Sequence, residues 1–161
     1  MEVMTRATEI ATHTAAEVES ALREAAELGP RAKAILHSRA IAAEDLKAAG
    51  GAFTLAEVCQ LRGGISRQAI YKAVQEKRIL AVGPERTPRR FPVAQFNDNG
   101  ELVEGLRDVY LALDTDNGFA VLNFLMRARG DLDNRRPIDL LRNGDIAPVL
   151  TLAMSIGDSD L

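Results

Sequence analysis

The sequence contains one cysteine, no tryptophan and few aromatic residues, and each of these scarcities excludes a class of protein. Cys59 has no second cysteine with which to form an intramolecular disulfide or a multi-cysteine zinc site. Its place in an apolar helical pattern predicts a small core residue. Aromatic residues make up 4% of the chain, so the core must consist of aliphatic side chains. This composition favours helices over a sandwich or a barrel.

The chain also lacks the patterns of enzymes, metal sites and membrane spans. His13 and His37 are the only imidazoles, and no serine or cysteine nucleophile is arranged with them. No glycine-rich phosphate-binding motif occurs, and Asp131 and Asp133 lack metal-ligand spacing. We therefore expect no catalysis, no cofactor and no metal. No run approaches about 18 apolar residues, and the first residues lack the layout of a signal peptide, so a cytoplasmic protein is expected.

Charge is segregated along the sequence. Residues 1–50 carry 8 acidic and 6 basic side chains, residues 51–97 carry 3 and 8, and residues 98–161 carry 12 and 6. A basic middle between acidic flanks indicates that the middle meets a polyanion while the flanks have other roles. These three segments are the expected domains.

The first segment predicts two helices, over residues 7–28 and 31–48. Apolar residues recur at helical spacing, Gly29-Pro30 separates the helices, and Gly50-Gly51 ends the second. Both are rich in alanine, which favours helix but buries little area. They are expected to pack on the rest of the chain or on a second copy, so we expect a homodimer.

The middle segment predicts a winged helix-turn-helix. Thr54 and Glu57 form a capping box that starts a helix ending near residue 62. Gly63-Gly64 makes the turn, and Ser66 caps a second helix that ends near residue 77. Strands at 79–82 and 91–96, joined by GPERTPRR, form a β-hairpin wing. The expected fold class is therefore mainly α: a helical bundle with a helix-turn-helix and a small β-hairpin wing.

Several polar residues of this segment are candidates for contact with double-stranded DNA. The second helix turns Ile65, Ala69, Ile70, Ala73 and Val74 inward. Arginine and glutamine on its outer face can pair with bases in the major groove, whereas lysine and serine suit phosphates. The candidates are Ser66, Arg67, Gln68, Tyr71, Lys72, Gln75, Lys77 and Arg78, with Arg86, Arg89 and Arg90 on the wing. The alternative interpretation is a solvated helix face beside a basic loop.

The last segment predicts helices over 102–113, 117–128, 137–141 and 146–155. The second of these is apolar over most of its circumference, which is typical of a buried helix. Pro137 opens the third at the position that proline favours, and Asn143-Gly144 ends it.

The run from Thr54 to Phe96 resembles the winged helix-turn-helix of excisionases and MerR-type regulators, with SRQAIYKAVQEKRILAV and RRFPVAQF as the most telling match. The resemblance implies a recognition helix at 66–77 and a DNA-touching wing at 83–90. The chain departs from the pattern by carrying two glycines at the turn where one is usual.

The run from Asn117 to Gly157 resembles the toxin-binding domain of Xre/MbcA/ParS-type antitoxins, and NRRPIDLL is its most specific element. Asn134 stands where a glycine is usual, and Phe124 where a tryptophan is common. The resemblance implies a bifunctional antitoxin that neutralises an NAD-consuming toxin of RES or related fold and represses its own operon. The implied toxin-binding residues are Arg135, Arg136, Pro137, Asp139, Leu140 and Leu141. The acidic tail, with Asp158 and Asp160, is a separate candidate that we expect to enter a cationic, nucleotide-binding cleft of the toxin. For Leu140 and Leu141 the alternative is plain core, and for Asp158 and Asp160 a frayed terminus.

Three hypotheses therefore remain open. The chain is an antitoxin and autorepressor, or a MerR-like or excisionase-like regulator without a toxin partner. The third is a helical interaction protein that does not bind DNA.

Overall fold

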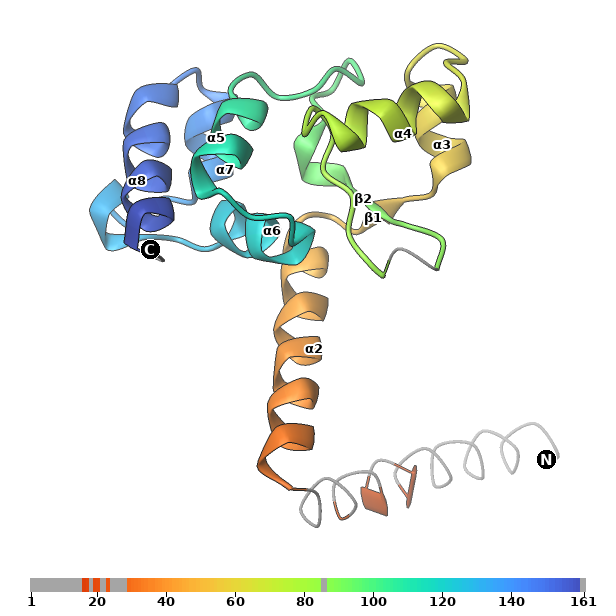
Figure 1. Ribbon diagram of the computed structural model, residues 1–161, viewed down its shortest axis with the longest axis vertical. Helices are drawn as coiled ribbons and strands as arrows, with labels where there is room; N and C mark the ends of the chain where they lie inside the picture. Colours follow the sequence, from red (N-terminus) through yellow and green to blue (C-terminus); the bar gives the residue numbers. More distant parts are fainter. Residues whose placement is uncertain (1–15, 18, 21–22, 24–28, 85–86, 160–161) are drawn as a thin grey trace, which may run out of the picture. The chain divides into compact units, whose positions relative to one another are not determined.

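The protein is mainly helical with a small two-stranded antiparallel sheet, as the sequence predicts (Figure 1). The computed structural model describes residues 16–17, 19–20, 23, 29–84 and 87–159. The chain divides into two compact units, residues 1–41 and residues 42–161. Its elements are α2 (Pro30–Ala48), β1 (Ala52–Phe53), α3 (Leu55–Leu61), α4 (Arg67–Gln75), β2 (Phe91–Pro92), the 3-10 turn η1 (Val93–Gln95), α5 (Leu106–Leu113), α6 (Gly118–Met126), the 3-10 turn η2 (Gly130–Leu132), α7 (Pro137–Arg142) and α8 (Ile146–Ser159).

The expected helices from residue 31 onward are present, some with shifted ends. The helix expected over 7–28 lies largely outside the described residues, and those described within it are helical. α5 begins at Leu106 and not at residue 102, because Val103 instead donates its backbone N–H to the Gln95 carbonyl at 2.8 Å. α8 continues to Ser159, beyond the expected end at residue 155.

The predicted strands pair differently from expectation. Ile79–Val82 forms no strand of its own, and only Val82 makes an antiparallel bridge, with Arg90. Phe91–Pro92 pairs instead with Ala52–Phe53, a strand before α3 that the sequence reading missed. The prediction of a strand over 91–96 is therefore wrong beyond Pro92, where the chain enters the turn η1.

Gln95 explains this departure, because its side chain takes the place of a strand partner for Leu80. The Leu80 N–H donates to Gln95 Oε1 at 2.7 Å, and Gln95 Nε2 donates to the Leu80 carbonyl at 2.8 Å. Both groups are buried, and Gln95 itself is 1% exposed. One side-chain amide thus satisfies both backbone groups of a buried residue, as buried polar groups require.

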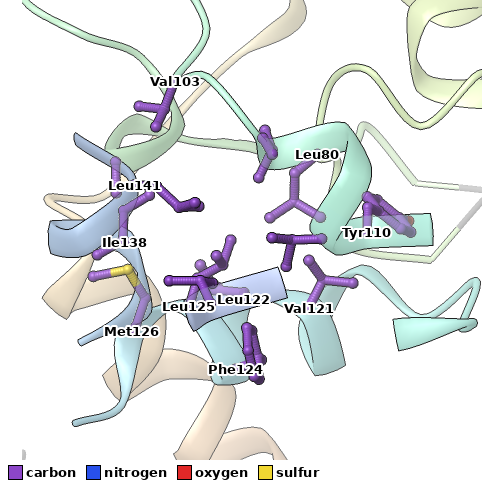
Figure 2. Close-up of a cluster of buried hydrophobic side chains, with 14 of the residues drawn as sticks. Leu80, Val103, Tyr110, Val121, Leu122, Phe124, Leu125, Met126, Ile138 and Leu141 are labelled. Atoms are coloured by element: carbon purple, nitrogen blue, oxygen red, sulfur yellow. The ribbon is translucent and has the colours of Figure 1, made fainter. Parts of the chain in front are cut away.

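The segment Ile79–Val82 lies between two hydrophobic clusters. Ile79 and Ala81 pack with Val58, Ile70 and Phe91 under the helix-turn-helix. Leu80 and Val82 pack in the larger cluster, formed mainly by α5, α6, α7 and α8. In extended backbone successive side chains point to opposite sides, so this segment contributes to both clusters. Figure 2 shows Leu80 among the side chains of the larger one.

Helix α6 approaches the same segment at van der Waals distance. A Cβ atom on Gly118, the first residue of α6, would lie 2.2 Å from the Ala81 carbonyl oxygen, so no larger residue fits there. Arg142 of α7 donates to the Ala94 carbonyl at 2.7 Å. Residues 51–97 and 98–161, expected as separate domains, therefore share packing and hydrogen bonds within the unit 42–161.

The C-terminal end of α2 is held to α6 by a buried carboxylate. Asp45 is 3% exposed and accepts hydrogen bonds from Asn123 Nδ2 at 2.9 Å and from Arg127 Nε at 3.0 Å. Burying a charge is costly unless it is paired and hydrogen-bonded, and both conditions are met here. This part of α2, from Ala42 onward, belongs to the second unit.

We predict that Gln95→Ala lowers the free energy of unfolding by about 3 kcal/mol, because it leaves the Leu80 N–H and carbonyl buried without partners. Urea unfolding followed by circular dichroism measures the change. Gln60→Ala, at an exposed position of α3, is the matched control and should change stability by less than about 0.5 kcal/mol. Equal effects of the two substitutions would contradict the role given to Gln95.

Candidate nucleic-acid interface

Helices α3 and α4 form the predicted helix-turn-helix, and local chemistry sets the limits of each. Thr54 Oγ1 accepts from the Glu57 N–H at 3.2 Å, and Ser66 Oγ accepts from the Ala69 N–H at 3.1 Å, so both predicted N-caps are confirmed. Gly63 and Gly64 have φ angles of +79° and +81°, which side-chain-bearing residues adopt only with strain. Two consecutive left-handed positions account for two glycines at this turn.

The outward face of α4 is confirmed. Arg67, Gln68, Tyr71, Lys72 and Gln75 are all exposed, whereas Ile70 and Ala73 are buried. One side of the helix thus exposes two cations, two amides and a phenol to solvent, while its opposite, apolar side is buried.

One expected core residue of this helix-turn-helix is not buried. Ile65, expected to pack inward, is 38% exposed, because it precedes the helical residues that face the core. It lies beside the turn, next to the cap residue Ser66.

Two basic residues that follow α4 are already engaged. Lys77 has a left-handed backbone (φ +59°), its ammonium lies 3.4 Å from Asp116, and it sits 5.3 Å from the centre of the Tyr110 ring. Its side chain is 22% exposed and links the helix-turn-helix to α5, whereas the expected contact of Lys77 with DNA stays a prediction. Arg78 is half-exposed and pairs with Glu76 at 2.6 Å.

The wing is a short loop closed by the bridge between Val82 and Arg90. Arg90 is exposed, as expected. Arg89 is partly buried, and its Nη2 donates to the Ala81 carbonyl at 3.0 Å, whereas its expected contact with DNA stays a prediction. Arg86 lies outside the described residues.

A groove of about 350 Å³ connects α4 with the wing. Arg67 and Tyr71 of α4 line it together with Arg90 of the wing. The remaining lining residues are Thr54, Leu55, Ala56, Pro88, Arg89 and Phe91. Among the residues that the structure describes, three arginines and no carboxylate line this groove, which therefore suits an anionic strand. The sequence reading missed Thr54 and Pro88 as groove residues, because only the tertiary structure brings them beside α4.

A second hollow, of 540 Å³, has the opposite charge. Asp98, Glu101 and Glu104 line it with one cation, Arg142, whose guanidinium is bonded to the Ala94 carbonyl. Three carboxylates repel a phosphate backbone. The groove beside α4 is therefore the better candidate for nucleic acid.

The RRPIDLL element is largely core. Pro137, Leu140 and Leu141 are buried, and each leucine is at most 2% exposed, so their expected direct contact with a toxin is wrong for the folded chain. They lie on the inward face of α7, and the two leucines belong to the larger hydrophobic cluster. Arg135 is exposed and lies 3.8 Å from Asp133.

Arg136 and Asp139 form a bidentate pair at the surface of α7. Arg136 Nε and Nη2 donate to the Asp139 carboxylate at 2.8 and 2.9 Å. These hydrogen bonds hold the pKa of Asp139 below its ordinary value, and they raise the pKa of Arg136. Of the two expected tail residues, Asp158 is exposed, and Asp160 lies outside the described residues.

Two exposed apolar residues of the C-terminal helices were not predicted from the sequence as surface residues. Leu111 of α5 is 46% exposed and Met154 of α8 is 53% exposed, on two helices that pack together (Figure 1). The helical period already places Leu111 off the broad apolar face of α5, so a signal for it was present.

Within the part of the chain that the structure describes, no group of three or more His, Cys, Asp or Glu residues could hold a metal ion. No described helix combines the length and apolar character needed to cross a membrane.

We predict that Asp139→Asn lowers the melting temperature at pH 7 and that this difference disappears in acid. Because the folded pKa of Asp139 is depressed, its contribution is complete above the unfolded pKa near 3.8 and is lost as the pH falls through the folded pKa. Thermal unfolding between pH 7 and pH 2.5 measures it. Asp133→Asn is the control, because Asp133 is 93% exposed in its pair with Arg135 and such pairs contribute little. A loss of equal size at pH 7 and pH 2.5 would contradict the assignment.

Comparison with known proteins assigns no family to this geometry. No family model matches the chain, and no curated protein or solved structure is significantly similar to it. The charge, exposure and contacts of the described residues are therefore the basis for a functional proposal.

Proposed function

We propose that the chain binds double-stranded DNA, with α4 as its recognition helix in the major groove and the wing against the adjacent backbone. The observation that carries the proposal is the exposure of every residue on the polar face of α4, beside a groove lined by arginines. A helix fits the major groove, where arginine pairs with guanine and glutamine with adenine. Arg67 and Gln68, at the N-terminal end of α4, are the side chains expected at base edges.

Lys72, Arg78 and Arg90 are the expected phosphate contacts. Lys72 is 72% exposed, and its only described ion pair, with Glu76, is long at 4.0 Å. Arg78 is also exposed and shares Glu76. Since Lys77 and Arg89 are committed to protein contacts, the basic side chains available to DNA number about four, including Arg67.

The first test of this proposal is the double substitution Arg67→Ala with Lys72→Ala. It should weaken binding to the DNA upstream of the chain's own gene at least about a hundredfold, because it removes a base contact and a phosphate contact. Fluorescence anisotropy measures the affinity. Arg135→Ala removes another exposed arginine, outside the interface, and should leave the affinity unchanged.

The same anisotropy measurement, repeated at several salt concentrations, gives the number of phosphate contacts. With about three phosphate contacts, log K should fall against log salt with a slope near −2.7. A flat response, or equal losses in the double variant and the Arg135 control, would overturn the proposal of a DNA interface at α4.

We propose further that the C-terminal helices bind a protein toxin, which makes the chain an antitoxin that represses its own operon. The acidic excess of residues 98–161 repels DNA, whereas the exposed Leu111 and Met154 offer apolar area to a protein. The resemblance of NRRPIDLL to the toxin-binding antitoxins points to a toxin of RES or related NAD-consuming type. The alternative is a MerR-like or excisionase-like regulator without a toxin partner.

Co-expression with the product of the neighbouring reading frame tests this second part. Leu111→Lys with Met154→Lys should abolish co-purification and growth rescue but leave DNA binding intact, because the two surfaces are separate. Arg67→Ala with Lys72→Ala should do the reverse. If each variant lost both DNA binding and toxin binding, the proposal of two separate surfaces would fail. If the wild-type chain did not bind the product of the neighbouring reading frame, the alternative of a regulator without a toxin partner would stand.

A further inference from the structure

We propose that Arg129 and Arg135, in the turn between α6 and α7, form a carboxylate-binding site that takes an aspartate or glutamate side chain of a partner protein. Arg129 has no role in the surfaces proposed above. The identity of the partner rests on the proposed toxin binding, whereas the chemistry of the site rests on the turn itself.

The turn brings two arginines to one face of the chain. Arg129 and Arg135 form an isolated antiparallel bridge, in which the Arg129 N–H donates to the Arg135 carbonyl at 3.2 Å. Side chains paired in this way extend from the same face with Cβ atoms about 5 Å apart, and like charges there repel each other. A carboxylate between the two guanidinium groups turns this repulsion into two charge-assisted hydrogen bonds.

The Arg129 guanidinium is held against an aromatic ring but retains a donor without an acceptor. It lies 4.7 Å from the centre of the Phe124 ring. Its Nε is buried and has no hydrogen-bond partner among the described residues, and such a donor is costly. Burial lowers the pKa of Arg129, although the Asp131 carboxylate opposes this shift. The side chain as a whole is partly exposed, so a small rotation of the guanidinium brings this donor to a carboxylate that arrives from solvent.

The other two arginines of the turn are already paired, which distinguishes the bridge arginines from them. Arg127 Nε donates to Asp45 at 3.0 Å. Arg136 donates twice to Asp139, at 2.8 and 2.9 Å. Neither arginine of the bridge has a carboxylate at hydrogen-bond distance among the residues that the structure describes.

The Arg135 side chain is exposed and only weakly engaged. Its Nε donates to the Leu132 carbonyl at 3.3 Å, and its Nη2 lies 3.8 Å from the Asp133 carboxylate. Asp133 is 93% exposed, and such a surface pair contributes little. A partner carboxylate can therefore replace Asp133 beside Arg135 at small cost.

The backbone of the turn holds the two arginines in position before any ligand arrives. Asp133 and Asn134 both adopt left-handed backbone, with φ angles of +56° and +58°, a region that these residue types tolerate. The N–H groups of Leu132 and Asn134 both donate to the Arg129 carbonyl, at 3.0 and 2.9 Å. A site that is already ordered loses little conformational entropy on binding.

The surrounding charge favours a carboxylate over a phosphate. Asp131 and Asp133 flank the site, and residues 98–161 carry 12 acidic and 6 basic side chains. This acidic environment repels a phosphate, with nearly two charges, more strongly than a carboxylate with one. Guanidinium groups match the planar geometry of a carboxylate.

Acetate is the probe that tests the site without any partner. The Arg129 Nε–H resonance of the full chain, identified by its loss in Arg129→Lys, is followed by NMR during titration with sodium acetate. It should shift saturably with a dissociation constant on the order of 10 millimolar, whereas sodium chloride at equal ionic strength should not shift it. No shift beyond that of chloride, or a saturable shift with inorganic phosphate alone, would overturn the proposal.

Arg135→Gln removes the second cation and should weaken acetate binding at least about tenfold. The melting temperature should change by less than about 2 °C, because the lost contacts are exposed and a like-charge repulsion disappears. Arg107→Gln is the matched control, since Arg107 is also exposed and its Nε also donates to a backbone carbonyl, that of Glu76 at 3.1 Å. Equal losses of acetate binding in the two variants would contradict the site.

The product of the neighbouring reading frame tests the proposed occupant. Arg129→Gln with Arg135→Gln should raise its dissociation constant at least about tenfold, and Arg107→Gln should leave it unchanged. An unchanged affinity in the double variant would overturn the binding of a partner carboxylate at this site. If acetate binds but the wild-type chain does not bind this product, the proposed toxin binding fails and the carboxylate site stands.

Discussion

The segment Ile79–Val82 is the constraint on which the second unit depends. Its alternate side chains enter two hydrophobic clusters, one under the helix-turn-helix and one among the C-terminal helices. The Gln95 side-chain amide forms hydrogen bonds with the backbone N–H and carbonyl of Leu80, and Gly118 of α6 packs closely against the Ala81 carbonyl. A segment buried on both sides cannot act as a linker, so the proposed DNA-reading and toxin-binding surfaces belong to one body.

This arrangement divides the basic residues of the middle segment into two groups. Arg67, Lys72 and Arg90 extend into solvent, where their charge is available to a polyanion. Lys77 and Arg89 turn toward Asp116 and the Ala81 carbonyl, and they join the helix-turn-helix to the rest of the unit. The net positive charge of the segment therefore overstates the number of cations that can reach DNA.

The RRPIDLL element shows a similar division between packing and surface. Its apolar residues fill the larger cluster, whereas Arg136 and Asp139 satisfy each other above them. The order of residues in RRPIDLL can therefore be explained by folding alone, because these residues start α7 and fill the hydrophobic cluster beneath it. Under the proposed function, contact with a partner would fall to residues outside the motif, such as the exposed Leu111 and Met154.

Local sequence alone determined the helix caps at Thr54 and Ser66, the outward face of α4 and most of the helices, because each depends on neighbours within about four residues. The tertiary structure decided which strand pairs with Phe91, which cations turn inward and which part of the C-terminal motif is buried. These outcomes depend on contacts between distant residues, such as Gln95 with Leu80 and Lys77 with Asp116. Neither hydrophobic period nor local propensity contains that information, because burial and pairing arise only when remote segments meet.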